Sequence, residues 1–81
     1  MGELSEQKTA EQIRREERLR KYKRYSELRD ERGYSDYRVG IATGIASAVF
    51  TEWKNGNYAP KIDKLMLIAN LFNVEVTEFL E

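Results

Sequence analysis

Histidine and cysteine, the side chains that most often act as general bases, nucleophiles and metal ligands, are absent from this 81-residue sequence. Without them we expect neither an enzyme nor a bound metal or cofactor. The chemistry that remains is that of charge, and the charge is unevenly placed. Residues 14–24 hold seven basic and two acidic side chains, whereas residues 33–81 hold four basic and six acidic ones. This pattern predicts a basic N-terminal element, able to contact phosphate groups, beside a mildly acidic domain.

The length of the chain allows one domain with a modest core. No apolar run approaches the ~20 residues that span a bilayer, and the first residues lack the apolar stretch of a signal peptide. We therefore expect a cytoplasmic protein with no membrane contact. The composition divides the chain into a basic N-terminal extension over residues 1–24 and a domain over residues 25–81.

The N-terminal extension favours a helix, although its first half is almost entirely charged. Thr9 and Gln12 have the spacing of a capping box, and Gly33 is a suitable residue to end a helix that begins near Ala10. The few apolar side chains of this stretch do not form a heptad seam, so a coiled coil is poorly supported. A solvated helix and a partly disordered arm both remain open for residues 1–24.

Two short helices and one longer helix are predicted in the rest of the chain, and no strand pattern is present. Helices over 36–43 and 47–54 are separated by Gly44, and the second ends at the Asn55-Gly56 turn signal. A longer helix over 61–72 has apolar residues at helical spacing on one face. These residues are Ile62, Leu65, Ile68, Ala69 and Phe72. Asn73 is expected to cap this helix, and residues 76–80 can form one last turn.

The two short helices have the features that a helix-turn-helix requires. Gly40 lies where the helices must cross, and Gly44 can adopt the positive φ that the turn needs. Val39, Ile45, Phe50 and Trp53 are placed to join the two helices to the body of the domain. Trp53, three residues after Phe50, is interpreted as a core residue.

Residues 25–80 resemble the phage-repressor (Cro-like) helix-turn-helix family, also called the xenobiotic-response-element family. The resemblance is carried by residues 28–35, Thr43-Gly44-Ile45, Trp53-Lys54-Asn55-Gly56, Pro60, Leu65, Ile68-Ala69 and Asn73-Val74. It implies an all-α, five-helix repressor-like bundle, here with an N-terminal helical extension. It also implies a role as a repressor, an activator or an immunity regulator. We therefore expect a sequence-specific DNA-binding transcriptional regulator that acts as a homodimer on a palindromic operator in double-stranded DNA.

The resemblance further implies that the helix at about 47–54 enters the major groove. Ser47, Ala48, Thr51 and Glu52 would face the base edges, with Lys54 nearby. Contacts to phosphates would come from Tyr37, Asn55, Asn57, Tyr58 and Lys61. The sequence departs from the family at Asp36, where a glutamine often approaches a phosphate. We interpret Asp36 as a favourable charge at a helix start rather than as a DNA contact.

Two questions remain open at this stage. The mildly acidic domain and the lack of Arg, Asn or Gln on the reading face also suit a protein-interaction module of the same fold, such as a coactivator-like bridge, an antitoxin or an antirepressor. The basic stretch either contacts phosphates or supports dimerisation, with Ile13, Leu19 and Tyr22 meeting a partner or covering Leu67 and Leu71. Those two leucines are expected to form an exposed pair, as at an interface.

Overall fold

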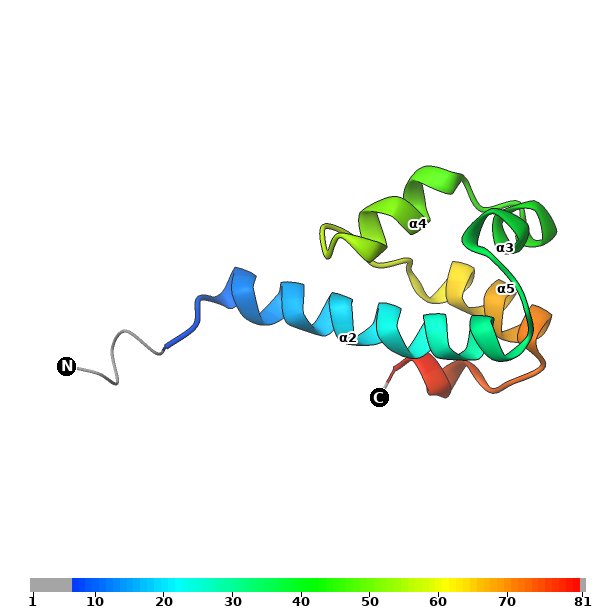
Figure 1. Cartoon of the computed structure of the whole chain (residues 1–81). Coiled ribbons are helices and arrows are strands. Elements are labelled where there is room, and N and C mark those ends of the chain that lie inside the picture. Colours follow the sequence, from blue (N-terminus) through cyan, green and yellow to red (C-terminus); the bar gives the residue numbers. More distant parts are fainter. Residues whose placement is uncertain (1–6, 81) are drawn as a thin grey trace.

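The computed structural model describes residues 7–80 and consists of four α-helices and one 3-10 helix within that range (Figure 1). The elements are α2 (Ala10–Glu31), α3 (Asp36–Thr43), α4 (Ser47–Lys54), α5 (Ile62–Phe72) and η1 (Val76–Phe79). No strand occurs among the described residues, so the all-helical prediction is confirmed. Residues 1–6 of the expected N-terminal extension lie outside the described range.

The expected number of five helices needs correction, because the last element is a 3-10 turn. Its four residues follow Glu75, whose side chain makes no capping hydrogen bond. A segment this short, without a side-chain cap, gains little from α-helical geometry and adopts the tighter turn. In addition, residues 10–31 form one uninterrupted helix, so the N-terminal arm and the first helix of the bundle are a single element.

Local signals in the sequence explain where the helices begin and end. The Thr9 side chain accepts a hydrogen bond from the Gln12 amide, and the Gln12 side chain accepts one from the Thr9 amide, which confirms the predicted capping box. Ser35 caps α3 by accepting from the Arg38 amide. Asn73 takes the left-handed conformation after α5, with φ of 59°. With 22 residues, α2 is about 33 Å long.

An aromatic cluster centred on Tyr25 of α2 forms the middle of the core. The Tyr25 ring lies 4.9 Å from that of Trp53, 5.7 Å from that of Phe50 and 6.0 Å from that of Phe72. Trp53 is fully buried, and its indole nitrogen donates to the Arg18 carbonyl at 3.1 Å. The interpretation of Trp53 as a core residue is therefore confirmed, and α2 is joined through it to α4.

Helix α5 buries the face that its sequence pattern predicts, with two exceptions. Leu65, Ile68, Ala69 and Phe72 belong to the core, but Ile62 is 50% exposed because it is the first residue of the helix, at its free end. Leu71, expected to be exposed, is instead half-buried against the core near the end of α5, where η1 packs. Leu67 is exposed as expected, so the predicted Leu67–Leu71 pair is not an exposed apolar pair.

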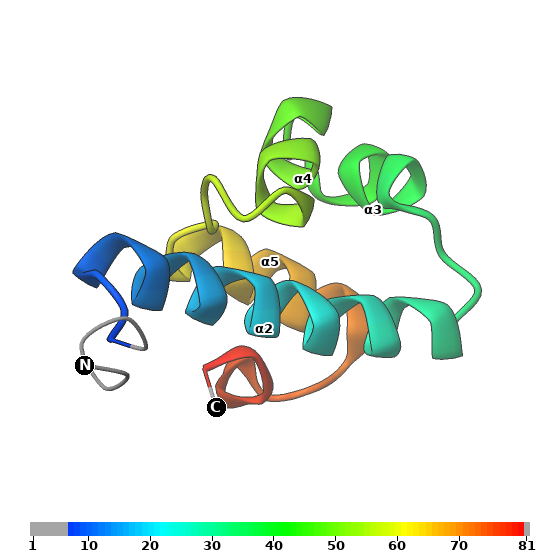
Figure 2. The ribbon, with the colours of Figure 1, turned by 60° about the vertical axis from the view of Figure 1, so that its left-hand side comes forward.

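The helices are arranged so that α2 separates two sides of the molecule. Figures 1 and 2 show α3 and α4 on one side of α2 and η1 on the other. No helix in the described part of the chain is both long enough and apolar enough to cross a membrane. The side that carries α3 and α4 holds the candidate site.

Candidate nucleic-acid interface

The turn between α3 and α4 is built around two glycines with different roles. Gly44 has φ of +79° and nothing near the place where a Cβ would stand, so its backbone conformation alone favours glycine. A Cβ on Gly40 would lie 3.0 Å from the carbonyl oxygen of Ile45 in the turn and 3.6 Å from the Phe50 ring of α4, so the close approach of α3 to both favours glycine there. Both predictions for these glycines are confirmed.

Buried side chains on both helices hold α4 in place. Val39 of α3, Ile45 of the turn, and Phe50 and Trp53 of α4 are all buried in the core, as predicted. Because Phe50 and Trp53 occupy one face of α4, its opposite face is turned to solvent. Ser47, Ala48, Thr51 and Glu52 lie on this face, and all four are exposed. The structure thus presents a short, rigid polar surface.

A hollow of about 380 Å³ lies between the start of α3 and α4. Five of the ten predicted site residues line it together with Asp36 and Phe50: Tyr37, Ser47, Thr51, Lys54 and Asn55. The remaining five do not line this hollow: Ala48, Glu52, Asn57 and Lys61 are exposed, and Tyr58 is half-buried. The predicted residues therefore all reach the surface, and about half of them converge on one place that contains hydroxyl, amide and ammonium donors.

The negative charge of Asp36, which borders this hollow, is compensated by three hydrogen-bond donors of α2. Its carboxylate accepts hydrogen bonds from the hydroxyls of Tyr22 and Tyr25, both at 2.7 Å, and from the Arg29 guanidinium at 2.7 Å. Burial alone would raise the pKa of Asp36, but the hydrogen bonds from Tyr25, Tyr22 and Arg29 outweigh it and hold the pKa below its ordinary value. Burial and the bond to Asp36 raise the pKa of both tyrosines.

This cluster was not predicted from the sequence, which indicated only a helix-start role for Asp36. Asp36 is indeed the first residue of α3, but its main partners come from α2. A signal was present, because Tyr22, Tyr25 and Arg29 are spaced three and four residues apart and share one helix face.

Glu52 of the exposed α4 face is connected to the N-terminal half of α2. The Asn57 side-chain amide donates to the Glu52 carboxylate at 3.0 Å, and Arg15 donates to the Asn57 side-chain oxygen at 2.9 Å. Arg18 donates to the Gly56 carbonyl at 2.9 Å. Sequence reasoning missed these contacts because Arg15 and Asn57 are 42 positions apart and neither belongs to a local pattern that predicts the other.

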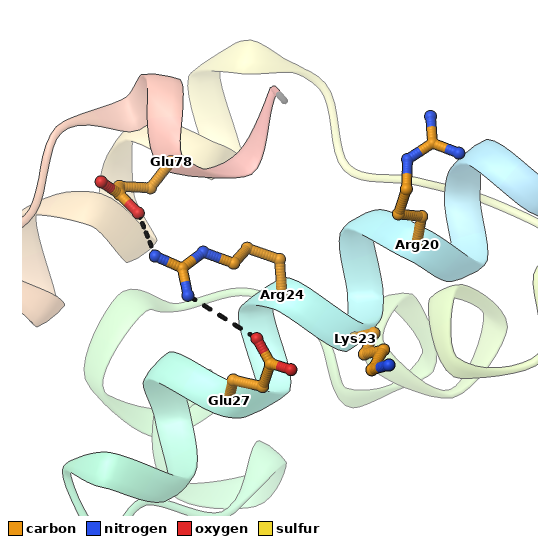
Figure 3. A pocket seen from close by; sticks show the side chains of 5 residues that line it. All are labelled: Arg20, Lys23, Arg24, Glu27 and Glu78. Carbon is orange, nitrogen blue, oxygen red and sulfur yellow. Dashed lines mark hydrogen bonds and ion pairs between the residues drawn. The ribbon is translucent and has the colours of Figure 1, made fainter.

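The basic stretch of residues 14–24 does not form a single basic face. Arg15 and Arg18 contact the segment that follows α4, whereas Arg20, Lys23 and Arg24 line a hollow with Glu27 and Glu78 (Figure 3). Arg24 forms ion pairs with Glu78 of η1 and with Glu27. Within residues 7–80, Arg20 and Lys23 take part in no ion pair. The positive charge is thus divided between two sides of α2.

Comparisons with known proteins agree with this geometry. A family model described as a Cro/C1-type HTH DNA-binding domain matches residues 24–81, which is more than two thirds of the chain. No curated protein and no solved structure matches the chain. In the described part of the chain, no group of three or more acidic side chains gathers where it could hold a metal ion.

Proposed function

The chain belongs to the Cro/C1-type helix-turn-helix DNA-binding family, and on this premise we propose that it is a sequence-specific transcriptional regulator that places α4 in the major groove. The observation that carries the proposal is the division of α4 into two faces. Phe50 and Trp53 are buried, while Ser47, Ala48, Thr51 and Glu52 are exposed side by side. A helix held rigidly from behind, with a polar front, is suited to read base edges.

The chemistry of the exposed α4 face suggests which base edges it reads. The hydroxyls of Ser47 and Thr51 donate or accept hydrogen bonds, and Ala48 and the methyl group of Thr51 can pack on a thymine methyl. The Glu52 carboxylate accepts a hydrogen bond from the N4 amino group of cytosine. This face holds no Arg, Asn or Gln, so bidentate readout of guanine or adenine is not part of the proposal.

The hollow beside α4 supports a role in binding the DNA backbone. Tyr37, Lys54 and Asn55 supply hydroxyl, ammonium and amide donors along its wall, and phosphate oxygens accept from all three. Asp36 borders the same hollow, but its pairing with Arg29 offsets its negative charge. Asn57 and Lys61, exposed in the segment between α4 and α5, extend the proposed backbone contacts.

We further propose that two copies of the chain bind a palindromic site as a homodimer, because helix-turn-helix dimers commonly read two half-sites one helical turn of DNA apart. Exposed apolar side chains on α5 support this proposal. Ile62, Met66 and Leu67 are each about half exposed, and all three lie between positions 62 and 67 of α5. The mass of the protein in solution, measured with and without its DNA site, tests this part of the proposal.

A specific observation also favours a second candidate function, a protein-interaction module of the same fold. Residues 33–81 hold four basic and six acidic side chains, a net charge of −2, which repels DNA at long range. Salt dependence separates the two functions. A DNA-binding protein gains affinity for random duplexes as the salt concentration falls, whereas the absence of DNA affinity at every salt concentration favours the interaction module.

Two substitutions test the proposed assignment of α4. Glu52→Ala is expected to relax the preference at one base pair by ~1–3 kcal/mol. Lys61→Ala should weaken binding to all sequences alike and lower the salt slope by about one unit, because it removes one phosphate contact. Binding to selected and random duplexes across a salt series provides the measurement. If both variants act identically on specific and random DNA, α4 is not the recognition helix.

A further inference from the structure

The N-terminal half of α2 lies outside the matched family domain, yet it contacts the turn that follows the recognition helix. The family match begins at residue 24, whereas Arg15, Arg18 and Leu19 all reach the Gly56 turn. A Cβ built on Gly56 would lie 3.0 Å from Cγ of Leu19 and 3.1 Å from Cγ of Arg15. This part of α2 is therefore packed tightly against the C-terminal end of α4.

A chain of two hydrogen bonds runs from this contact to the reading face of α4. Arg15 Nη1 donates to Asn57 Oδ1 at 2.9 Å, and Asn57 Nδ2 donates to Glu52 Oε1 at 3.0 Å. Arginine can only donate hydrogen bonds and a carboxylate can only accept them. The asparagine amide between them therefore has one favourable orientation, with its oxygen toward Arg15 and its amino group toward Glu52.

This arrangement restrains Glu52 without using all of its acceptor capacity. Asn57 occupies one carboxylate oxygen, and no other hydrogen-bond donor in the described range contacts the Glu52 carboxylate. A carboxylate offers roughly four lone-pair sites on its two oxygens, so the second oxygen remains able to accept from a base. Holding a flexible side chain in one orientation before binding reduces the entropy that recognition costs.

We propose that Arg15 is a positioning residue for base recognition, acting through Asn57 to orient Glu52 toward the N4 amino group of a cytosine. The inference rests on the proposed function and adds that a residue outside the family domain sets preference at one base pair. Without Arg15, the Asn57 amide has no donor to fix its orientation. Glu52 is then free to adopt other rotamers, and discrimination against the wrong base falls.

Matched substitutions in α2 separate this role from a general effect of charge. Arg15→Met keeps the aliphatic stem that packs on Gly56 and removes the donor. Arg14→Met removes the same charge from the neighbouring residue, whose guanidinium is paired only with Glu11, at 3.7 Å, within the described residues. Arg15→Lys keeps the charge and supplies an ammonium group that can donate to Asn57, and it serves as the rescue variant. Circular dichroism and thermal unfolding show whether each variant is folded.

The measurement is the affinity of each full-length variant for the selected duplex and for the duplexes with every single base-pair change. We expect Arg15→Met to lower discrimination at the base pair that Glu52 reads by about threefold to tenfold. Arg14→Met should leave that ratio unchanged, and Arg15→Lys should restore part of it. In a Glu52→Ala background, Arg15→Met should have no further effect on discrimination, because the residue through which it acts is missing.

Three other results overturn the inference. If Arg15→Met and Arg14→Met weaken all duplexes by the same factor, Arg15 contacts phosphate only, and the proposed function stands without the positioning role. If Arg15→Met lowers discrimination equally in the Glu52→Ala background, Arg15 acts by another route. If the wild-type chain binds no duplex at any salt concentration, the proposed function fails, and the inference fails with it.

Discussion

The Asp36 carboxylate shows how a single residue can depart from a family pattern and gain a structural role. It accepts hydrogen bonds from two tyrosines and one arginine of α2, and it therefore joins α2 to the start of α3. The same residue borders the hollow that we propose for a phosphate group. Pairing with Arg29 makes a carboxylate tolerable there, because the guanidinium offsets the repulsion of an anion.

The lowered pKa of Asp36 predicts a stability that depends on pH. A carboxyl whose pKa is lower in the folded state stabilises the protein above its unfolded pKa of about 3.9, and this stability is lost as the pH falls through the folded value. Asp36→Asn should lower the free energy of unfolding by about 2 kcal/mol at pH 7, the typical size of a lost charge-assisted bond. The difference from wild type should shrink toward pH 2. Urea unfolding at several pH values provides the measurement.

Asp30→Asn is the matched control for this prediction. The Asp30 side chain is 67% exposed and pairs with the same arginine, Arg29, at 2.8 Å. An exposed pair of this kind contributes little to stability, so the free energy of unfolding of this variant should stay within about 0.5 kcal/mol of the wild-type value at every pH. An equal loss of stability in both variants would show that Asp36 is no more than another exposed partner of Arg29.

The connection between α4 and α5 depends on contact with a third helix, α2. The chain turns at Gly56, which has φ of +79° and is buried under Leu19 and Arg15. Arg18 donates to the Gly56 carbonyl, and Trp53 donates to the Arg18 carbonyl in return. The end of the proposed recognition helix is thus held from two directions, by its own core residues and by α2.

Substitution of the two turn glycines separates backbone conformation from packing. Gly44 and Gly56 have the same φ of +79°, but only Gly56 has atoms within 4 Å of a built Cβ. Gly44→Ala should destabilise the protein by about 1–2 kcal/mol through its left-handed backbone alone. Gly56→Ala should destabilise the protein by about 1–3 kcal/mol more than Gly44→Ala does, because the new methyl group overpacks the contact with α2. Thermal or urea unfolding measures both losses.

A second substitution in α2 checks the origin of that difference. Leu19→Ala removes the Cγ that would stand 3.0 Å from the new methyl group on Gly56. Combined with Gly56→Ala, it should recover part of the extra loss, whereas combined with Gly44→Ala it should recover nothing. If the two glycine substitutions lower the free energy of unfolding by the same amount, α2 moves readily away from the turn and does not restrain it.

In the whole molecule, charge is distributed around α2 rather than along one side of it. Arg15 and Arg18 lie near the end of α4, while Arg20, Lys23 and Arg24 border the hollow with Glu78 on the side of η1 (Figure 3). The side of α2 that carries α4 is the side on which we place DNA. Part of the basic stretch therefore faces away from the proposed interface, and only part of it can contribute to phosphate binding there.

Removal of residues 1–22 tests the contribution of the N-terminal half of α2. The deletion removes the Arg18 carbonyl bonded to Trp53 and the Tyr22 ring, which meets Trp53 edge-on at 5.5 Å. Loss of these contacts should cost about 2 kcal/mol, equivalent to roughly 8–16 °C in melting temperature for a domain of this size. The fluorescence of Trp53 should shift to the red as the indole gains contact with water. A shorter deletion that ends at residue 8 keeps α2 intact and is the control.

The same deletion distinguishes the two duties considered for the basic stretch. We expect DNA affinity and its salt slope to fall while the oligomeric state in solution stays the same, because phosphate contacts are lost. A switch to monomer with an unchanged salt slope per subunit would instead assign the segment to dimerisation. An unchanged melting temperature, oligomeric state and salt slope would make it a passive tail.

The sequence by itself determined the features that depend on neighbouring residues. The Thr9 capping box, the Ser35 cap, the positive φ of Gly44 and the left-handed Asn73 all follow from local hydrogen bonding and backbone sterics. The spacing of Val39, Ile45, Phe50 and Trp53 predicted the core of the helix-turn-helix, because the period of a helix decides which side chains share a face. These local rules were enough to place α3, α4 and α5 within about one residue of their observed ends.

Only the tertiary structure decided which distant residues meet. The exposure of Ile62 and the partial burial of Leu71 differ from the prediction, because the ends of α5 differ in what packs against them. The three partners of Asp36, and the link from Arg15 through Asn57 to Glu52, join segments that are separated by a turn or by 42 positions. Hydrogen-bond capacity is a property of each side chain, but the partner that satisfies it depends on how the helices cross, and helical periodicity within one segment contains no information on that crossing.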